Sequence, residues 1–325
     1  ASVNAGIPYE VPAVTINKVC GSGLKTVNLA TQAILLGDAD IIVAGGMESM
    51  SNVPYYLNKH RFGSKLGHAE AQDGIIRDGL WDVYNDFHMG NAAEICAREC
   101  NISREEQDEF AITSYKRAIK AHEEGYFDDE IIEMKVKDRK GNVSKVKMDE
   151  ELKRINYDKV PKLNPVFQKD GTVTPANASS INDGAAAVLL MSEEKAEELG
   201  YTPLARIVSQ ASAAKKPEWF TTAPADAIPK AMKRGNIEKD EIDLFEINEA
   251  FSVVSLANEQ ILELDPSKVN IHGGAVSIGH PIGCSGARII VTLLHALKRT
   301  KGRYGCAGIC NGGGGASAMV LEMLN

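Results

Sequence analysis

The sequence predicts an α/β protein built from two similar halves. The same order of glycine-containing turn, helix, buried strand and glycines occurs twice. It runs first from VCGSG (19–23) to ADIIVAGG (39–46), and then from GCSGARIIVTLLHALKR (283–299) to YGCAGICNGGGG (304–315). Short apolar strands that alternate with helical patterns are typical of a sheet covered by helices. The length of 325 residues is sufficient for two such halves, each with its own core.

The first half opens with a cysteine beside a glycine turn. Apolar residues from Val27 to Leu36 recur at helical spacing, and Gly37 ends the helix. Cys20 is therefore expected at or just before a helix N-terminus. Free backbone N–H groups and the helix dipole favour a thiolate at such a position, and the thiolate is the nucleophilic form. A buried structural cysteine is the alternative, because free cysteine is often buried.

A segment of different character, residues 51–170, is expected as an insertion in the first half. Its stretch 103–125 is amphipathic and starts with the capping box Ser103 and Glu106, and a lysine-rich hairpin follows at 134–148. Long excursions from an α/β core are often lids or binding loops. The insertion is therefore expected to cover a site.

The first half resumes after the insertion. Asn182-Asp183-Gly184 is predicted as a turn, followed by a strand at 184–192 and a helix at 193–200. A strand at 202–214 opens the second half. The predicted division is thus 1–50 with 171–200 for the N-terminal half, 51–170 for the inserted domain and 201–325 for the C-terminal half.

Composition excludes several classes of protein. The formal net charge is −8, and the 36 lysines and arginines form no long basic block, which argues against a nucleic-acid surface. No apolar run approaches the ~20 residues that span a bilayer. Six cysteines in a chain of this length indicate a reducing compartment rather than a disulfide framework. Cys96 and Cys100 lie one helical turn apart, but no second ligand pair follows at zinc spacing.

Three further motifs join Cys20. They are EINEAFS (246–252), GGAVSIGHPIGCSGAR (273–288) and GICNGGGGASA (308–318). With VCGSG they resemble the thiolase family, and the resemblance extends over the whole chain. AGGMESMSNVPYY and TVTPANASSINDGAAA are most similar to the mitochondrial members of animals. The resemblance implies the thiolase fold, in which two duplicated α/β halves form an α-β-α-β-α five-layer sandwich with an inserted loop domain. It also implies a homo-oligomer, a dimer or a tetramer.

The resemblance also implies catalytic roles. Cys20 matches the nucleophile that becomes acylated, His280 matches the base that takes its proton, and Cys310 matches the acid and base at the α-carbon. His280 with a water held by Asn248 would form one oxyanion site, and the N–H groups of Cys20 and Gly312 would form the other. Joining two thioesters requires a covalently held acyl group, a base for a weakly acidic C–H and stabilised oxyanions. A second cysteine with a pKa near neutral would serve as both acid and base.

Each of these residues has a structural alternative. Cys310 on a buried strand is equally compatible with simple core packing, and His280 before proline with a turn. Four further residues are interpreted as structural and receive no role: Cys284, Cys306, His272 and His295.

Coenzyme A is expected as substrate and product, with no covalently bound cofactor. The resemblance implies a pantetheine tunnel with apolar walls and few polar contacts. The residues that match it are Leu80, His88, Met89, Arg154, Ser179, Ala250 and Phe251.

A potassium site is also implied, because the animal mitochondrial members are stimulated by potassium. The matching positions are Tyr115, Pro175, Ala176, Ala178 and Val276. Pro175 stands where alanine is usual, but most ligands there are carbonyls, so the substitution is compatible with a site. Phe220 matches an aromatic residue linked to 2-methyl-branched substrates, whereas Thr221 replaces the proline that normally follows it.

The implied function is that of an acetyl-CoA C-acetyltransferase, which interconverts two acetyl-CoA with acetoacetyl-CoA and CoA. The alternatives are a 3-ketoacyl-CoA thiolase of broader chain length, a ketoacyl synthase of the same superfamily, and a truncated, non-catalytic acyl-CoA-binding chain. Ketoacyl synthases use Cys-His-His or Cys-His-Asn sites, whereas a second cysteine, Cys310, stands in CNGGGG here. The implied compartment is the mitochondrial matrix, with the cytoplasm as the alternative, and the stretch ASVNAGIPYE has no features of a targeting segment.

Thiolases carry a further stretch before the equivalent of Ala1, including the first β-α units of the first half. The strands at 39–46 and 184–192 are therefore expected to lose partners when that stretch is absent, because unpaired strand edges remain open. A chain that begins at Ala1 is accordingly expected to aggregate or to be inactive, and the chain with the extension to be a soluble, active oligomer.

Overall fold

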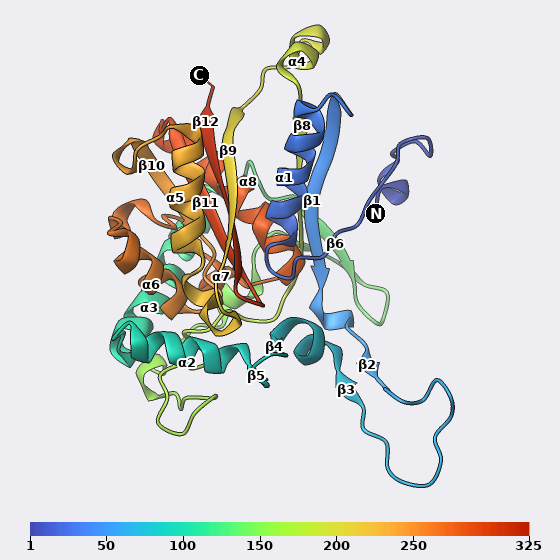
Figure 1. The fold of residues 1–325 in the computed structure, drawn as a ribbon, viewed down its shortest axis with the longest axis vertical. Coiled ribbons are helices and arrows are strands. Elements are labelled where there is room, and N and C mark those ends of the chain that lie inside the picture. The colour runs from blue at the N-terminus through green and yellow to red at the C-terminus, as the bar shows by residue number, and fades with distance from the viewer. Residues whose placement is uncertain (325) are drawn as a thin grey trace.

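Two β-sheets with a layer of helices between them form the body of the molecule (Figure 1). The computed structural model describes residues 1–324. The larger sheet has four strands in the order β10-β11-β12-β9, and the smaller sheet pairs β1 with β8. Helices α1 and α8 lie between the sheets, and α5 covers the outer face of the larger one. The described residues thus form four layers, in the order β, α, β, α.

The elements follow one another in the order expected of an α/β chain. The helices are α1 (Ser22–Leu35), α2 (Met89–Glu99), α3 (Arg104–Glu123), α4 (Glu193–Leu199), α5 (Pro224–Gly235), α6 (Ser252–Leu262), α7 (Ala275–Ile278) and α8 (Ile282–Thr300). The strands are β1 (Ile41–Ser49), β2 (Tyr55–Tyr56), β3 (Gln72–Asp73), β4 (Trp81–Asp82), β5 (Phe87–His88), β6 (Met134–Lys137), β7 (Val143–Val146), β8 (Asp183–Met191), β9 (Ala205–Ala214), β10 (Ile242–Ile247), β11 (Tyr304–Asn311) and β12 (Gly315–Met323).

Local sequence signals explain where several elements begin and end. The capping box that starts α3 is present, with Ser103 accepting from the backbone N–H of Glu106 and the Glu106 side chain accepting in return. Gly37 ends the turn after α1 with a φ of 76°, a left-handed conformation that glycine adopts without strain. The strand predicted at 184–192 is present as β8, but it begins one residue earlier, at Asp183, which was predicted as turn only. Asp183 belongs to β8 because β1 continues far enough to pair with it.

Glycines bring α1 and α8 into close contact in the central layer. A side chain at Gly23 would place its Cβ 2.6 Å from the backbone nitrogen of Ala287, and one at Gly286 would collide with the backbone of Leu24. Only residues without a side chain allow two helices to approach this closely. The N-terminal ends of the two helices therefore meet.

The smaller sheet has one covered and one open face. Helices α1 and α8 pack on the inner face, whereas Val43, Met47 and Leu189 on the other face are more than half exposed. Within residues 1–324, β1 and β8 pair only with each other.

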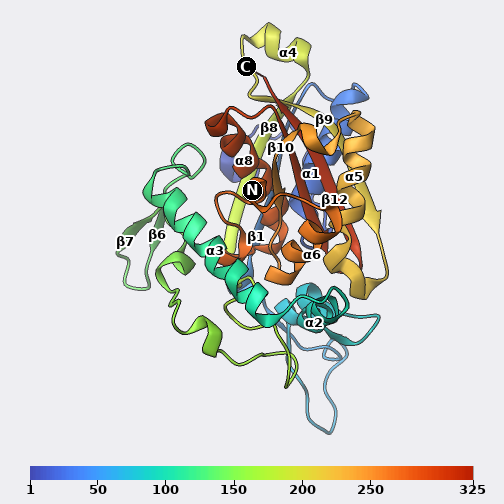
Figure 2. The same ribbon diagram turned by 90° about the vertical axis from the view of Figure 1, so that its left-hand side faces the viewer.

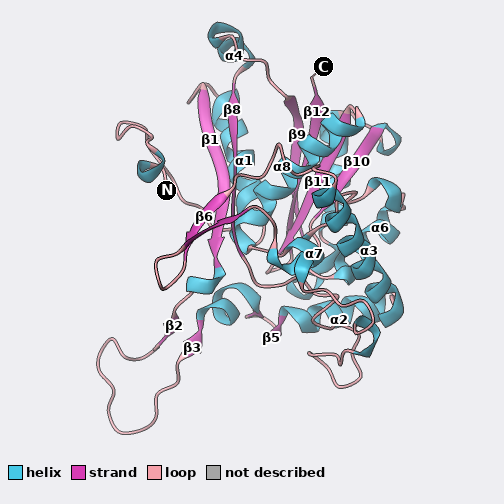
Figure 3. Cartoon of the chain, turned by 180° about the vertical axis from the view of Figure 1, so that it is seen from behind, coloured by secondary structure: helices cyan, strands magenta, loops and turns pink. Residues whose placement is uncertain are grey.

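The segment expected as an insertion contains α2, α3 and the short strand pairs β2-β3, β4-β5 and β6-β7. Helix α2 packs against α6, and α3 packs against α6 and α7, so both lie beside the second half (Figure 2). The loop between β2 and β3 extends away from the rest of the chain (Figure 3). None of the helices in residues 1–324 has the length and hydropathy that a membrane span requires.

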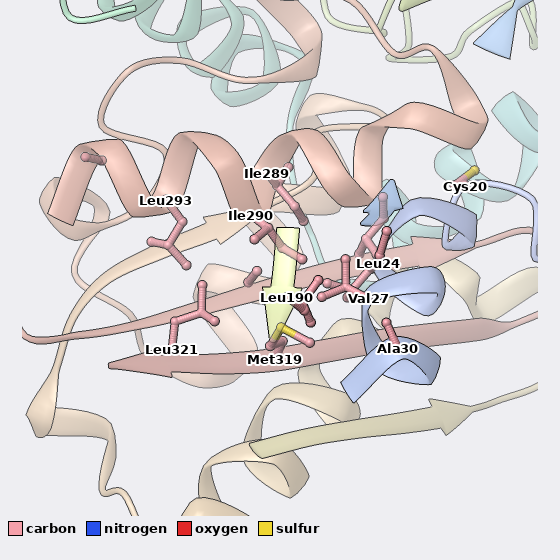
Figure 4. Close-up of a cluster of buried hydrophobic side chains, with 14 of the residues drawn as sticks. Cys20, Leu24, Val27, Ala30, Leu190, Ile289, Ile290, Leu293, Met319 and Leu321 are labelled. Atoms are coloured by element: carbon pink, nitrogen blue, oxygen red, sulfur yellow. The ribbon is translucent and has the colours of Figure 1, made fainter. Parts of the chain in front are cut away.

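A buried apolar cluster fills the space between the two sheets (Figure 4). Leu24 and Val27 enter it from α1, Leu293 enters from α8 and Met319 from β12. Each fully buried side chain of this size stabilises the fold by about 1.5–3 kcal/mol. Cys20 lies at one end of this cluster, so the packing of the central layer fixes the position of its sulfur.

Candidate active site

The candidate residues meet where helix N-termini face strand C-termini. Cys20 lies two residues before α1, and His280 lies two residues before α8. Asn248 directly follows β10, and Cys310 is the penultimate residue of β11, the strand that pairs with β10. A Cβ at Gly21 would lie 3.3 Å from Oδ1 of Asn311, so the cysteine turn touches the end of β11. Ligand sites of α/β proteins commonly occupy this edge of a parallel strand pair.

A tight turn holds Cys20 in place. Ser22 Oγ donates to the carbonyl of Val19 at 2.6 Å and accepts from the N–H of Lys18 at 2.8 Å. Val19 has a φ of 49°, which is unfavourable for a β-branched residue. Such strain persists only where the surrounding structure imposes it, and it is frequent at functional sites.

Burial has a larger effect on the pKa of Cys20 than the helix terminus has. Burial raises the pKa of its thiol to about 11, although the backbone N–H groups of Gly312 and of Cys20 itself lower it. The expectation that the helix terminus favours a thiolate is therefore wrong, because burial outweighs the backbone donors. The resting form of Cys20 is a thiol, and its proton must be removed during the reaction.

His280 is a buried, neutral imidazole. Burial, together with the nearby charge of Arg288, lowers its pKa to about 3. Its Nδ1 lies 2.6 Å from Oγ of Ser285, whereas its Nε2 is buried without a partner in the described residues. A neutral imidazole with a free ring nitrogen is able to accept a proton.

Asn248 is held by the strand beside it. Its backbone N–H donates to the carbonyl of Gly308 at 3.0 Å, and its Oδ1 accepts from Nη2 of Arg288 at 3.4 Å. The side-chain Nδ2 is buried and has no partner in the described part of the chain. An amide N–H group of this kind can donate to a water or to a substrate oxygen.

Cys310 is fully buried on β11, opposite Ala316 of β12. Burial raises its pKa well above the ordinary value, and the nearby Cys20 raises it further. The expectation of a near-neutral pKa is thus wrong, because strand pairing and packing remove water from the sulfur. Gly312 follows at the strand end, where a Cβ would lie 3.6 Å from the Cε of Met89.

The structure groups five of the seven positions expected to bind coenzyme A. Met89, Ala250 and Phe251 share one buried cluster with Cys310. The hydroxyl of Ser179 donates to the carbonyl of Ala250 at 2.8 Å. His88 caps α2, so it lies next to Met89.

The other two positions lie apart from this group. Leu80 packs at the edge of the central cluster that contains Cys20. Arg154 is exposed and pairs with Glu150 and Glu151 at 2.9 Å each, which directs its guanidinium to its own segment.

Phe167 packs against two of the positions expected to bind coenzyme A and was not predicted from the sequence. Its ring stacks on His88 with the ring centroids 4.7 Å apart, and it meets the ring of Phe251 edge to face at 6.4 Å. It comes from an irregular segment whose local sequence carries no motif. Only the three-dimensional arrangement shows that it lies beside these candidate residues.

The potassium candidates come from three segments that pack together. Tyr115 of α3 and Val276 of α7 share a buried cluster. The segment 174–178 is tied to α3 by a hydrogen bond of 2.9 Å from Asn177 Nδ2 to Asp108 Oδ1. Within residues 1–324 no cluster of three or more His, Cys, Asp or Glu side chains is suited to a metal ion, so the ligands would be carbonyl and phenol oxygens.

The fold, and the two free cysteines Cys20 and Cys310 that lie near each other, are those of an acyltransferase of the thiolase class. Two family models match the chain: "Thiolase, N-terminal domain" over residues 1–194 and "Thiolase, C-terminal domain" over residues 201–323. The chain belongs to the thiolase family, and the expected thiolase fold is confirmed.

Individual relatives agree with this assignment. Acetyl-CoA acetyltransferase 1 of Arabidopsis thaliana is 57% identical over all of this chain and 79% of its own length. The mitochondrial acetyl-CoA acetyltransferase of Bos taurus is 54% identical over all of this chain and 76% of its own length. The crystal structure of the Bacillus anthracis acetyl-CoA acetyltransferase matches with a TM-score of 0.96 and 44% identity, over 99% of this chain and 82% of that one. The human mitochondrial 3-ketoacyl-CoA thiolase has the same TM-score and coverage at 40% identity.

Proposed function

We propose that this chain is an acetyl-CoA C-acetyltransferase, which interconverts two acetyl-CoA with acetoacetyl-CoA and CoA. The observation that carries the proposal is the meeting of Cys20, His280, Asn248 and Cys310 at one edge of the fold. The names of relatives that share 51–57% of their residues with this chain support the same reaction.

In the direction of cleavage, the proton of Cys20 passes to Nε2 of His280 as the sulfur attacks the ketone carbon of acetoacetyl-CoA. The new S–C bond forms, the C2–C3 bond breaks, and the electron pair of that bond remains on the departing acetyl-CoA. Cys310 donates the proton that converts this carbanion into acetyl-CoA. The CoA thiol then gives its proton to the Cys310 thiolate and attacks acetyl-Cys20, which forms a second acetyl-CoA, and the departing Cys20 sulfur recovers its proton from His280.

Two groups of donors would stabilise the charged oxygens. The backbone N–H groups of Cys20 and Gly312 both lie close to the Cys20 sulfur. They would therefore also lie close to the oxygen of an acyl group that is bound to this sulfur. A protonated His280 and a water held by the free Nδ2 of Asn248 would serve the thioester oxygen of the carbanion. Losing one such donor typically costs about 10² to 10³ in rate.

Thiolysis assays with substrates of different length test this function. Protein purified with the N-terminal stretch that its relatives carry should consume acetoacetyl-CoA in the presence of CoA, and 3-ketooctanoyl-CoA should react much more slowly. Equal rates with both substrates would support the broader-chain alternative. No thiolysis of either substrate, with folding verified, would support the non-catalytic alternative.

The acetylation step should keep its rate as the pH falls. The pKa of His280 lies below its ordinary value, at about 3, so its imidazole stays neutral and basic at pH 5. The acetylation rate should therefore change by less than about twofold between pH 7.5 and 5.0, whereas a histidine with the ordinary pKa of ~6.5 would lose about 30-fold. Rapid-quench mass spectrometry of Cys20 measures this rate. An acid limb with a midpoint near 6.5 would contradict a buried neutral base.

Potassium is proposed to bind at the segment 174–178 and to raise activity. The carbonyls of Pro175 and Ala176 accept no backbone hydrogen bond within residues 1–324, and burial raises the pKa of Tyr115 to about 12, which keeps its hydroxyl neutral. Neutral carbonyl oxygens are ligands that K⁺ accepts. Replacing NaCl by KCl at constant ionic strength should increase the thiolysis rate, and a Tyr115→Phe variant should respond less. Identical thiolysis rates in NaCl and KCl would contradict the proposed potassium site.

The assembly and the compartment are proposals of the same kind. A homo-oligomer, a dimer or a tetramer, follows from the family resemblance, and sedimentation would determine its size. Relatives named as mitochondrial and as cytosolic are both similar to this chain. The mitochondrial matrix remains our proposed compartment, with the cytoplasm as the alternative.

A further inference from the structure

Two buried polar atoms of the site lack partners for a common reason. Nε2 of His280 and Nδ2 of Asn248 are both buried without a hydrogen bond in the described residues. Buried polar atoms are normally paired, so an unpaired one usually marks a position where a ligand or water binds. In each of these side chains the other polar atom is engaged by a residue of α8.

Ser285 determines which nitrogen of His280 carries the proton. Its side chain is fully buried, and its hydroxyl donates to the carbonyl of Pro281 at 2.9 Å. The hydroxyl has one proton, and that proton is already used. Oγ must therefore accept from Nδ1 of His280, which lies 2.6 Å away. With the proton on Nδ1, Nε2 keeps its lone pair and acts as the base.

Arg288 determines the orientation of the Asn248 amide in the same way. It lies one helical turn after Ser285, and its Nη1 donates to the carbonyl of Gly279 at 2.7 Å. Its Nη2 faces the Asn248 side chain at 3.4 Å. A guanidinium has donors only, so the amide must present its oxygen to Arg288 and its NH₂ group to the site. Arg288 thus also fixes the backbone of Gly279, the residue that precedes His280.

We propose that Ser285 and Arg288 are positioning residues, which fix the proton of His280 and the amide orientation of Asn248 from one face of α8. Neither side chain needs to touch the substrate. The proposal rests on the proposed function for its effect on the acetyl-transfer rate, but the effect of Ser285 on the reactivity of Cys20 is independent of that function.

A double-mutant cycle between Ser285 and His280 tests the first assignment. Ser285→Ala should slow acetylation of Cys20 by acetoacetyl-CoA about 10- to 100-fold, since general-base catalysis contributes ~10² to 10⁴. The KM should change much less than kcat, and Ser285→Thr should recover part of the rate because it retains the hydroxyl. In a His280→Ala background the Ser285→Ala change should have no further effect. Equal losses in both backgrounds, or no loss in the native background, would overturn the assignment.

A matched control and a second readout keep the test decisive. Ser255→Ala removes another fully buried helical serine, which lies on α6 and makes no hydrogen bond to His280 or Asn248, and this variant should react at the native rate. The same cycle is repeated with iodoacetamide, which alkylates Cys20 without any acyl-CoA chemistry. If native protein is never acetylated, the proposed function fails. The alkylation cycle then still decides whether Ser285 acts through His280.

A cycle between Arg288 and Asn248 tests the second assignment. Arg288→Lys keeps the positive charge among the neighbouring acidic groups but cannot reach both oxygens at once. The neighbours on which its charge acts include Glu130, Asp149, Glu246 and Glu249. The variant should lower kcat for thiolysis about tenfold in native protein, and it should have little effect when Asn248 is already alanine. Additive losses would show that Arg288 does not act through Asn248.

Discussion

A Cys310→Ala variant should lose acetoacetyl-CoA synthesis by about 10² to 10⁴, the range that general acid–base catalysis contributes, while Cys20 is still acetylated. The physical reason is that acetylation of Cys20 by acetyl-CoA transfers the acetyl group from one sulfur to another, with CoA as the leaving thiol, and requires no proton transfer at carbon. Exchange of labelled CoA into acetyl-CoA measures the first partial reaction, and formation of acetoacetyl-CoA measures the second. The exchange rate should fall by much less than the synthesis rate.

Cys306→Ala provides the control for this variant. Cys306 is also fully buried on β11, and burial raises its pKa to about 12, but it lies four residues before Cys310 in a different buried cluster, which is formed with α5. Its removal should reduce stability through a small cavity and leave both partial reactions intact. If Cys310→Ala lost exchange and synthesis by the same factor, Cys310 would not be specific to the carbanion step.

A Cys20→Ser variant should lose both partial reactions by at least about 10³, because a serine hydroxyl is a much weaker acid and the neutral His280 is a weak base for it. Its volume is close to that of cysteine, so the packing of the central cluster should be retained. Thermal unfolding should confirm that the fold is intact, and the two partial reactions are measured as for Cys310. If the Cys20→Ser variant still exchanged labelled CoA into acetyl-CoA at the native rate, Cys20 would not be the nucleophile.

Cys284→Ala is the matched control for Cys20. Cys284 is buried at the start of α8, and burial raises its pKa to about 11, as for Cys20. No role is assigned to it. Its alanine variant should therefore retain exchange and synthesis, which would show that a buried thiol at this end of the fold is not sufficient for reactivity.

The sequence predicted most of the secondary structure that positions the site. The helical spacing after Cys20 and the apolar run at 39–46 correspond to α1 and β1, and 283–299 corresponds to α8. These elements have strong periodic signals over many residues. The start of β8 at Asp183 was predicted one residue too late because pairing with a distant strand decided it, and local propensity carries no information about that partner.

The electrostatics of the site were beyond prediction from the sequence for a related reason. A helix terminus beside Cys20 is visible in the sequence, but the burial that raises its pKa results from packing between α1, α8 and β11. The same holds for Cys310. Ser285 and Arg288 stand within a recognised motif, yet their partners His280 and Asn248 become evident only from the hydrogen bonds.

The most direct test of the central claim is the intact mass of the chain after incubation with acetoacetyl-CoA, with and without CoA. Without CoA, the mass should increase by one acetyl group, and peptide mapping should place that group on Cys20. Addition of CoA should return the mass to that of the free chain and release acetyl-CoA. A folded chain that never gains an acetyl group, or that carries it on a residue other than Cys20, would contradict the account.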